Sequence, residues 1–132
     1  MKKQTESTLT VLLVEPEKKP RVVTIPHTLK EMQNLVGGLI ECTQPFTDSE
    51  VALISNEEGK LLGLPLNRAI FWKDSTEPYD IIAGTFFIVG APSDSEEFES
   101  LPEDKLETYA KRFAHPECFF KAFGKLHIIP ME

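Results

Sequence analysis

Apolar and polar residues alternate in short blocks along the chain, and the first blocks have the pattern of paired strands. Residues 9–15 (LTVLLVE) and 21–25 (RVVTI) are apolar and β-branched, which is typical of strands. The polar segment PEKKP between them has the composition of a hairpin loop. Pro16 and Pro20 lack the N–H that a central strand needs, so both belong in the connection. The pattern predicts an N-terminal hairpin.

The next block has helical spacing. Thr28 followed by Glu31 is a capping-box pattern, and apolar side chains then recur every three or four residues. Gly37 and Gly38 can take the left-handed conformation that ends a helix. We therefore expect a short helix here, followed by an extended stretch over 39–46.

A second helix is predicted near the C-terminus. Ser100 and Glu103 have capping-box spacing, and Pro102 suits a first helical turn. One apolar face follows, made by Leu106, Tyr109, Ala110 and Phe113. Pro116 is expected to end this helix near His115.

The remaining apolar blocks predict strands. Residues 51–56 form one strand, and residues 79–91 (YDIIAGTFFIVGA) form the strongest one. The second has no alternation, so both of its faces should be covered and it should lie centrally, with Gly84 marking a bulge or a close approach. A last strand is expected in LHIIP. The interpretation is an α+β fold, a largely antiparallel sheet of about five or six strands with two main helices on one side.

Size and composition favour an ordinary globular protein. The 132 residues suit a single domain over 1–132, with 41% hydrophobic residues and no apolar run long enough to span a bilayer. The N-terminus lacks the apolar region of a signal peptide, so we expect a cytoplasmic protein. Cys42 and Cys118 are too few for a disulfide scaffold and predict free thiols, more often buried than exposed.

The charge is concentrated in one segment. Residues 94–107 hold seven acids and one base, in a chain of net charge −7. The acids are Asp94, Glu96, Glu97, Glu99, Glu103, Asp104 and Glu107. Binding to a long nucleic acid needs clustered Lys and Arg, so this composition disfavours it.

Catalytic and metal-binding motifs are missing from the sequence. There is no GxSxG, HExxH or phosphate-binding loop, and nothing near Cys42 lowers its pKa. His115 and Cys118 form only half of a zinc site. We expect no metal, no cofactor and no enzymatic activity.

Asn67 and Arg68 are the most conspicuous polar pair, because they lie between two apolar runs. A guanidinium fork and an amide in an apolar wall have the composition of a ligand pocket, in which aromatic side chains could stack a base. The candidate ligand-binding residues are Asn67, Arg68, Phe71, Trp72, Tyr79 and Thr85. In the alternative interpretation, Arg68 pairs with Asp80 or an acid of 94–107, and Asn67 supports a turn.

These segments also carry a family resemblance. The stretches GLPLNRA and IIAGTFFI, with the N-terminal hairpin and HPECFF, resemble a family named domain of unknown function thirty-eight forty-six. The resemblance covers about residues 8–120. It implies a small protein encoded by a phage or another mobile element of Firmicutes and related gut bacteria, acting inside the host cell, with no agreed activity or catalytic residues.

Two counter-defence functions remain open at this stage, and a housekeeping regulator of the mobile element with no defence role is a third possibility. The first is a counter-defence module that sequesters a nucleotide-type immune signal, with Arg68 on phosphate. The second is an inhibitor that docks on a host defence protein through Asp94, Glu96, Glu97 and Glu99, with DNA mimicry as its least favoured form. A homo-oligomer is compatible with either, and no membrane partner is expected.

Overall fold

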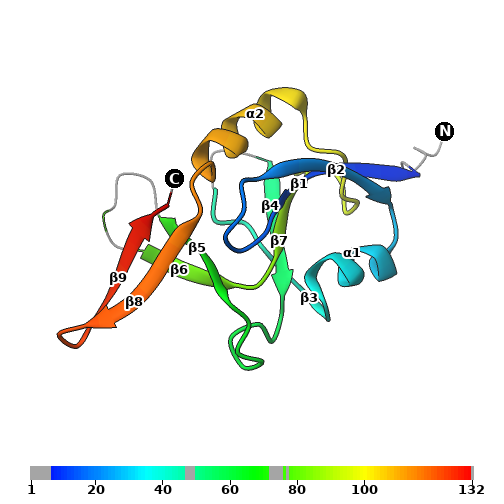
Figure 1. The fold of residues 1–132 in the computed structure, drawn as a ribbon. Helices are drawn as coiled ribbons and strands as arrows, with labels where there is room; N and C mark the ends of the chain where they lie inside the picture. Colours follow the sequence, from blue (N-terminus) through cyan, green and yellow to red (C-terminus); the bar gives the residue numbers. More distant parts are fainter. Residues whose placement is uncertain (1–6, 47–49, 72–75, 77, 132) are drawn as a thin grey trace.

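The structure is a computed structural model that describes residues 7–46, 50–71, 76 and 78–131. Nine strands and two helices lie within these residues (Figure 1). In chain order they are β1 (Thr8–Val14), β2 (Arg21–Pro26), α1 (Leu29–Val36), β3 (Ile40–Thr43), β4 (Val51–Asn56), β5 (Leu66–Phe71), β6 (Pro78–Ala83), β7 (Phe86–Gly90), α2 (Glu103–Arg112), β8 (Glu117–Ala122) and β9 (Lys125–Pro130).

The strands form three sheets. The largest has five antiparallel strands in the order β2-β1-β7-β4-β3, and β5-β6 and β8-β9 are separate antiparallel pairs. The prediction of an α+β fold built on an antiparallel sheet with two helices is confirmed. The two extra strand pairs were not expected.

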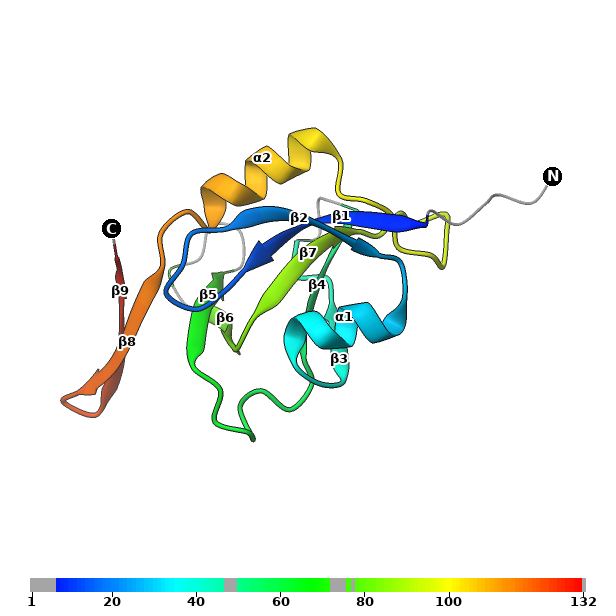
Figure 2. The same ribbon diagram turned by 45° about the vertical axis from the view of Figure 1, so that its right-hand side comes forward.

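The two helices cover opposite faces of the five-stranded sheet (Figure 2). Leu12 and Val14 of β1 pack in the cluster that includes Tyr109 of α2, whereas Val11 and Leu13 pack in the cluster that includes Met32 of α1. The expectation of helices on one side was therefore wrong. Successive side chains of a strand point to opposite faces, and an apolar run without alternation makes both faces apolar, so each face needs a cover.

The segment 79–91 is two strands rather than one. Gly84 has a φ of +84°, and the chain passes there from β6, which pairs with β5, to β7 in the five-stranded sheet. A Cβ at this position would lie 2.8 Å from Leu64 Cδ1. The predicted central position holds for β7 alone, because the left-handed glycine turns the chain out of one sheet and into another.

The ends of the helices show where local signals succeed. At α1, Glu31 N donates a hydrogen bond to Thr28 Oγ1 at 3.1 Å, and Gly37 caps the C-terminus with a φ of +79°, as predicted. At α2, Pro102 is the N-cap and no side chain caps the helix, which ends at Arg112. The expected cap, Ser100, instead accepts a hydrogen bond from Thr10 N at 2.9 Å. Its hydroxyl therefore links the segment before α2 to β1.

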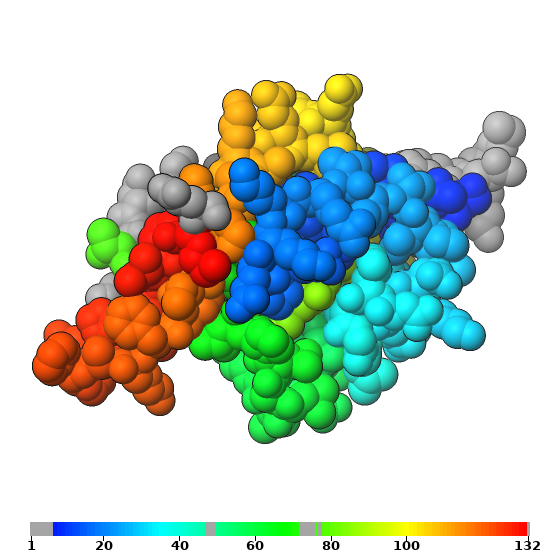
Figure 3. Space-filling view, in the orientation of Figure 1, coloured from blue at the N-terminus to red at the C-terminus, as the bar shows by residue number. Residues whose placement is uncertain are grey.

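The chain ends in a hairpin that projects from the body (Figure 3). The predicted last strand, β9, pairs with β8, which the sequence did not predict, and the two-residue turn Phe123–Gly124 joins them. Within the described part of the chain, no helix is long and apolar enough to cross a membrane.

Candidate functional site

Asn67 and Arg68 lie at the start of β5, and both are 0% exposed. The β5–β6 register shifts between Leu66 and Arg68, which is a bulge. A bulge re-aims the side chains next to it. This local irregularity accompanies the burial of two adjacent polar side chains in the interior.

Both N–H donors and the oxygen of the Asn67 side-chain amide are hydrogen-bonded within the protein. Its Nδ2 donates to Val14 O and to Gly84 O, each at 2.9 Å, and its Oδ1 accepts a bond from Arg68 Nη1 at 2.8 Å. Asn67 thus connects the end of β1 to the junction between β6 and β7.

Arg68 makes five hydrogen bonds to protein oxygens. Its Nη2 donates to Lys18 O at 2.7 Å and to Phe113 O at 3.0 Å, and its Nε reaches Phe113 O at 3.4 Å. Its Nη1 donates to Oδ1 and, at 3.3 Å, to the backbone oxygen of Asn67. A guanidinium has five N–H groups, so this network leaves none for a phosphate.

The network joins segments that are far apart in the sequence. Lys18 belongs to the β1–β2 connection, and Phe113 follows α2. Burial lowers the pKa of the Arg68 guanidinium, and the carboxylate of Glu117 partly offsets this. In turn, burial raises the pKa of Glu117, opposed by a hydrogen bond from Ala69 N at 2.7 Å and by the charge of Arg68. The hydrogen bond from Ala69 N to the Glu117 carboxylate joins β5 to β8.

The alternative interpretation was wrong about the partners of Arg68, which it expected to be Asp80 or an acid of 94–107. Asp80 accepts a hydrogen bond from Lys60 Nζ at 2.6 Å, and no salt bridge within 4 Å joins Arg68 to any acid of the described residues. Backbone carbonyls replace the carboxylate because the guanidinium is enclosed by chain segments whose C=O groups need donors.

The other predicted ligand-binding residues are not gathered on one open surface with this pair. Phe71 lies at the far end of β5 and is half-buried, Tyr79 is 44% exposed, and Thr85 is half-buried between β6 and β7. Trp72 lies outside the described residues. A ligand-binding role for these residues stays a prediction.

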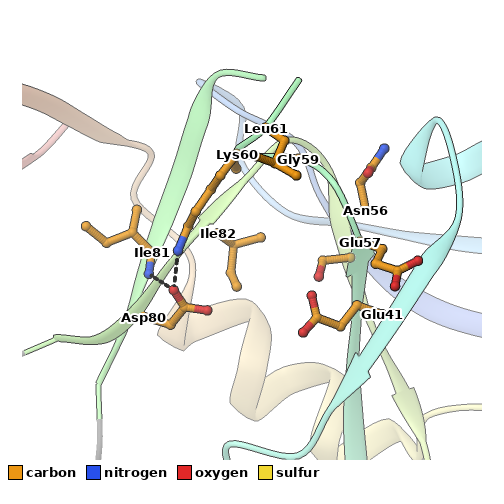
Figure 4. Close-up of a pocket in the computed structure, with 11 residues that line it drawn as sticks. Glu41, Asn56, Glu57, Gly59, Lys60, Leu61, Asp80, Ile81 and Ile82 are labelled. Carbon is orange, nitrogen blue, oxygen red and sulfur yellow. Dashed lines mark hydrogen bonds and ion pairs between the residues drawn. The ribbon is translucent and has the colours of Figure 1, made fainter. Parts of the chain in front are cut away.

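A separate pocket of about 220 Å³ opens between the β4–β5 loop and β6 (Figure 4). Lys60 and Asp80 form their ion pair at one side, and the carboxylates of Glu41 and Glu57 lie at the other. Pockets that hold drug-sized ligands span about 300–1,000 Å³. Three carboxylates and one already paired lysine make this pocket unsuitable for an anionic nucleotide.

The acidic segment lies on the surface, as its composition suggests. Asp94, Glu96 and Glu97 are exposed in the loop after β7, and Glu99 is half-exposed. The exposed acids of α2 continue the same charge and are Glu103, Asp104 and Glu107. We call these seven residues the acidic surface.

Both cysteines are free, which confirms the prediction of unpaired thiols. Both are also exposed, which corrects the expectation of burial: Cys42 is on the edge strand β3 and Cys118 is on the projecting hairpin. Partial burial of the Cys42 thiol raises its pKa. Among the residues that the structure describes, no three His, Cys, Asp or Glu side chains are grouped to hold a metal ion.

Sequence reasoning missed the most exposed apolar surface. The hairpin β8–β9 and the residue after it expose five large apolar side chains, namely Phe120, Phe123, Leu126, Ile129 and Met131. The available signal was the segment CFFKAFGKLHII, in which two apolar runs lie on either side of Gly124, a pattern typical of a hairpin. The sequence predicted only a last strand in LHIIP, and the structure shows a hairpin whose large apolar side chains lie in solvent.

Comparison with known proteins gives a family without an assigned activity. No curated protein and no solved structure matches the chain significantly. The family described as Domain of unknown function (DUF3846) matches residues 9–114, a span from β1 through α2 that stops before the hairpin. The chain therefore belongs to the DUF3846 family.

Proposed function

We propose that this protein is a non-enzymatic binding module of a phage or mobile element, and that it docks on a host defence protein through the acidic surface. The observation that carries the proposal is the contrast between two polar features. The guanidinium of Arg68 is enclosed and its donors are occupied, whereas the carboxylates of Asp94, Glu96 and Glu97 face solvent.

The acidic surface suits a basic protein partner. Complementary charge on two proteins speeds their encounter and selects the partner. A duplex carries one charge per about 1.7 Å of its axis, so seven acids over one loop and one short helix are a poor imitation of DNA. A basic patch on a protein is the better match.

Sequestration of a nucleotide receives less support from the geometry. It needs at least one free donor for phosphate, and the one candidate arginine is already bound to backbone oxygens. The pocket beside Lys60 is small and acidic. Native mass spectrometry of protein purified from cells with a nucleotide-signalling defence system tests this route, because a co-purified nucleotide would reinstate it.

The docking proposal is tested by crosslinking inside bacteria that carry candidate defence systems. A variant with Asp94→Asn, Glu96→Gln and Glu97→Gln should lose the crosslinked host protein and keep its melting temperature. A matched control with Glu41→Gln and Glu57→Gln removes acids elsewhere and should keep the crosslink. Retention of the same host protein by the first variant would contradict the proposal.

A further inference from the structure

The hairpin β8–β9 has the features of a docking element. It is a two-stranded sheet of its own, and it projects from the body (Figures 1 and 3). Isolated two-stranded hairpins are marginally stable, and unpaired edges and apolar faces in water are unfavourable. The aromatic ring of Phe120 stacks on His127 at 5.1 Å, which covers only part of one face.

The tip of the hairpin carries a residue that the turn itself does not favour. Phe123 is 100% exposed and has a φ of +53°, and Gly124 follows with a φ of +75°. Two left-handed residues in a two-residue hairpin favour Asn-Gly, and a bulky residue there costs about 1–2 kcal/mol. Because the ring is fully exposed, its contacts within the chain offset little of this conformational free energy. Backbone strain of this kind clusters at functional sites, so it points to a contact of the tip outside the chain.

The charge of the tip differs from that of the rest of the protein. Lys121 and Lys125 flank Phe123, and residues 118–131 contain no acid, in a chain of net charge −7. The tip is thus an apolar side chain between two positive charges. Its complement is an apolar hollow with an acidic rim.

The protein itself has such a hollow, at the other end. A hollow of about 340 Å³ lies between the end of β3 and the loop after β7. Ala91, Pro92 and Phe98 supply apolar lining, and Glu96 and Glu97 supply carboxylates. This volume reaches the lower end of the range of ligand pockets, so it is large enough to receive one aromatic side chain.

We propose that a second copy of this chain is the partner of the hairpin, with Phe123 of one copy seated in the hollow beside Glu96 and Glu97 of the next. Figures 1 and 2 show the hairpin and the loop after β7 on opposite sides of the molecule. The contact is therefore head-to-tail, and each copy offers one tip and one hollow. The inference uses part of the acidic surface of the proposed function, but it requires no host target.

Sedimentation velocity of the full chain over rising concentration tests the contact. The wild type should exceed the 14.9 kDa mass of one chain, and its association constant should fall about tenfold or more at 0.5 M salt, since charges form the rim. Phe123→Asn should remain monomeric and melt no lower than the wild type, because Asn suits the turn. A control that removes exposed apolar surface elsewhere, Leu61→Asn, should associate like the wild type.

Mixing two variants provides the decisive result. A protein with Glu96→Lys and Glu97→Lys lacks the hollow rim but keeps the tip, and Phe123→Asn lacks the tip but keeps the hollow. Each alone should be monomeric, and an equal mixture should form a species of twice the single-chain mass. Glu103→Lys with Glu107→Lys makes the same charge change on α2 and should preserve self-association.

Several outcomes would overturn the proposal. These are a wild type that stays monomeric at all concentrations, a Phe123→Asn protein that still associates, or a mixture that stays monomeric. Flotation of a monomeric wild type with phosphatidylserine vesicles, lost in Phe123→Asn, would instead assign the tip to a lipid surface. Because Phe123→Asn leaves the acidic surface intact, its crosslinking to a host protein separates failure of self-association from failure of the proposed function.

Discussion

Replacement of Arg68 by Met is the sharpest test of the buried network. Methionine replaces the aliphatic part of the arginine side chain, ends near the position of Nε, and removes every donor of the guanidinium. Four acceptors then lose a donor, namely Lys18 O, Phe113 O, Asn67 Oδ1 and Asn67 O. The substitution therefore removes the hydrogen bonds of the guanidinium and keeps the packing of the aliphatic part of the side chain.

The magnitude follows from these acceptors. A buried polar group left without a partner costs about 1–3 kcal/mol, and breaking a buried charged contact by removing one partner costs about 3–5 kcal/mol. Relief from burying the guanidinium charge offsets part of the sum. We expect the free energy of unfolding to fall by about 3–5 kcal/mol, a large share of the roughly 5–15 kcal/mol that stabilises a domain.

Urea unfolding followed by circular dichroism measures this change at constant slope. Arg68→Lys should lie between wild type and Arg68→Met, because a lysine keeps the charge but has three donors in place of five. The matched control is Arg21→Met, which removes an exposed arginine paired with Glu15 at 3.1 Å and should cost less than about 1 kcal/mol. A loss below about 1 kcal/mol for Arg68→Met, coupled to loss of a bound small molecule, would refute the structural interpretation and restore the ligand site.

Three further predictions concern the backbone and pH. Gly84→Ala should lower the free energy of unfolding by about 1–3 kcal/mol in urea, because a Cβ there meets Leu64 in a left-handed conformation; an unchanged midpoint would contradict this geometry. Thr28→Ala should cost about 0.5–2 kcal/mol through loss of the cap to Glu31 N, while Thr28→Ser should cost little. Burial raises the pKa of Glu117 above its unfolded value, so its contribution to stability is present below that value and is lost as pH rises through the folded pKa. Glu117→Gln should therefore flatten the stability profile above the ordinary pKa of a glutamate, and a steeper profile would show that the sign is wrong.

The sequence by itself determined the features that depend on neighbouring residues. The N-terminal hairpin, the Thr28 cap and the left-handed stop at Gly37 all follow from signals within a few positions of each other. The α+β class and the free cysteines followed from the same kind of local pattern and from composition. Each of these needs only backbone propensity, capping chemistry or side-chain period.

Only the tertiary structure decided how those pieces meet. Whether 79–91 is one strand or two depends on which sheet receives each half, and the face of the sheet on which each helix packs depends on the path of the connecting chain. The same holds for Asn67 and Arg68: a polar pair between apolar runs has one composition whether it lines a pocket or is buried. Their partners lie as far as 53 residues away along the chain, so no local pattern contains them. The structure resolves the ambiguity because it shows that carbonyls from distant segments converge on the pair. It also leaves the large apolar side chains of the hairpin in solvent, which no local pattern specifies.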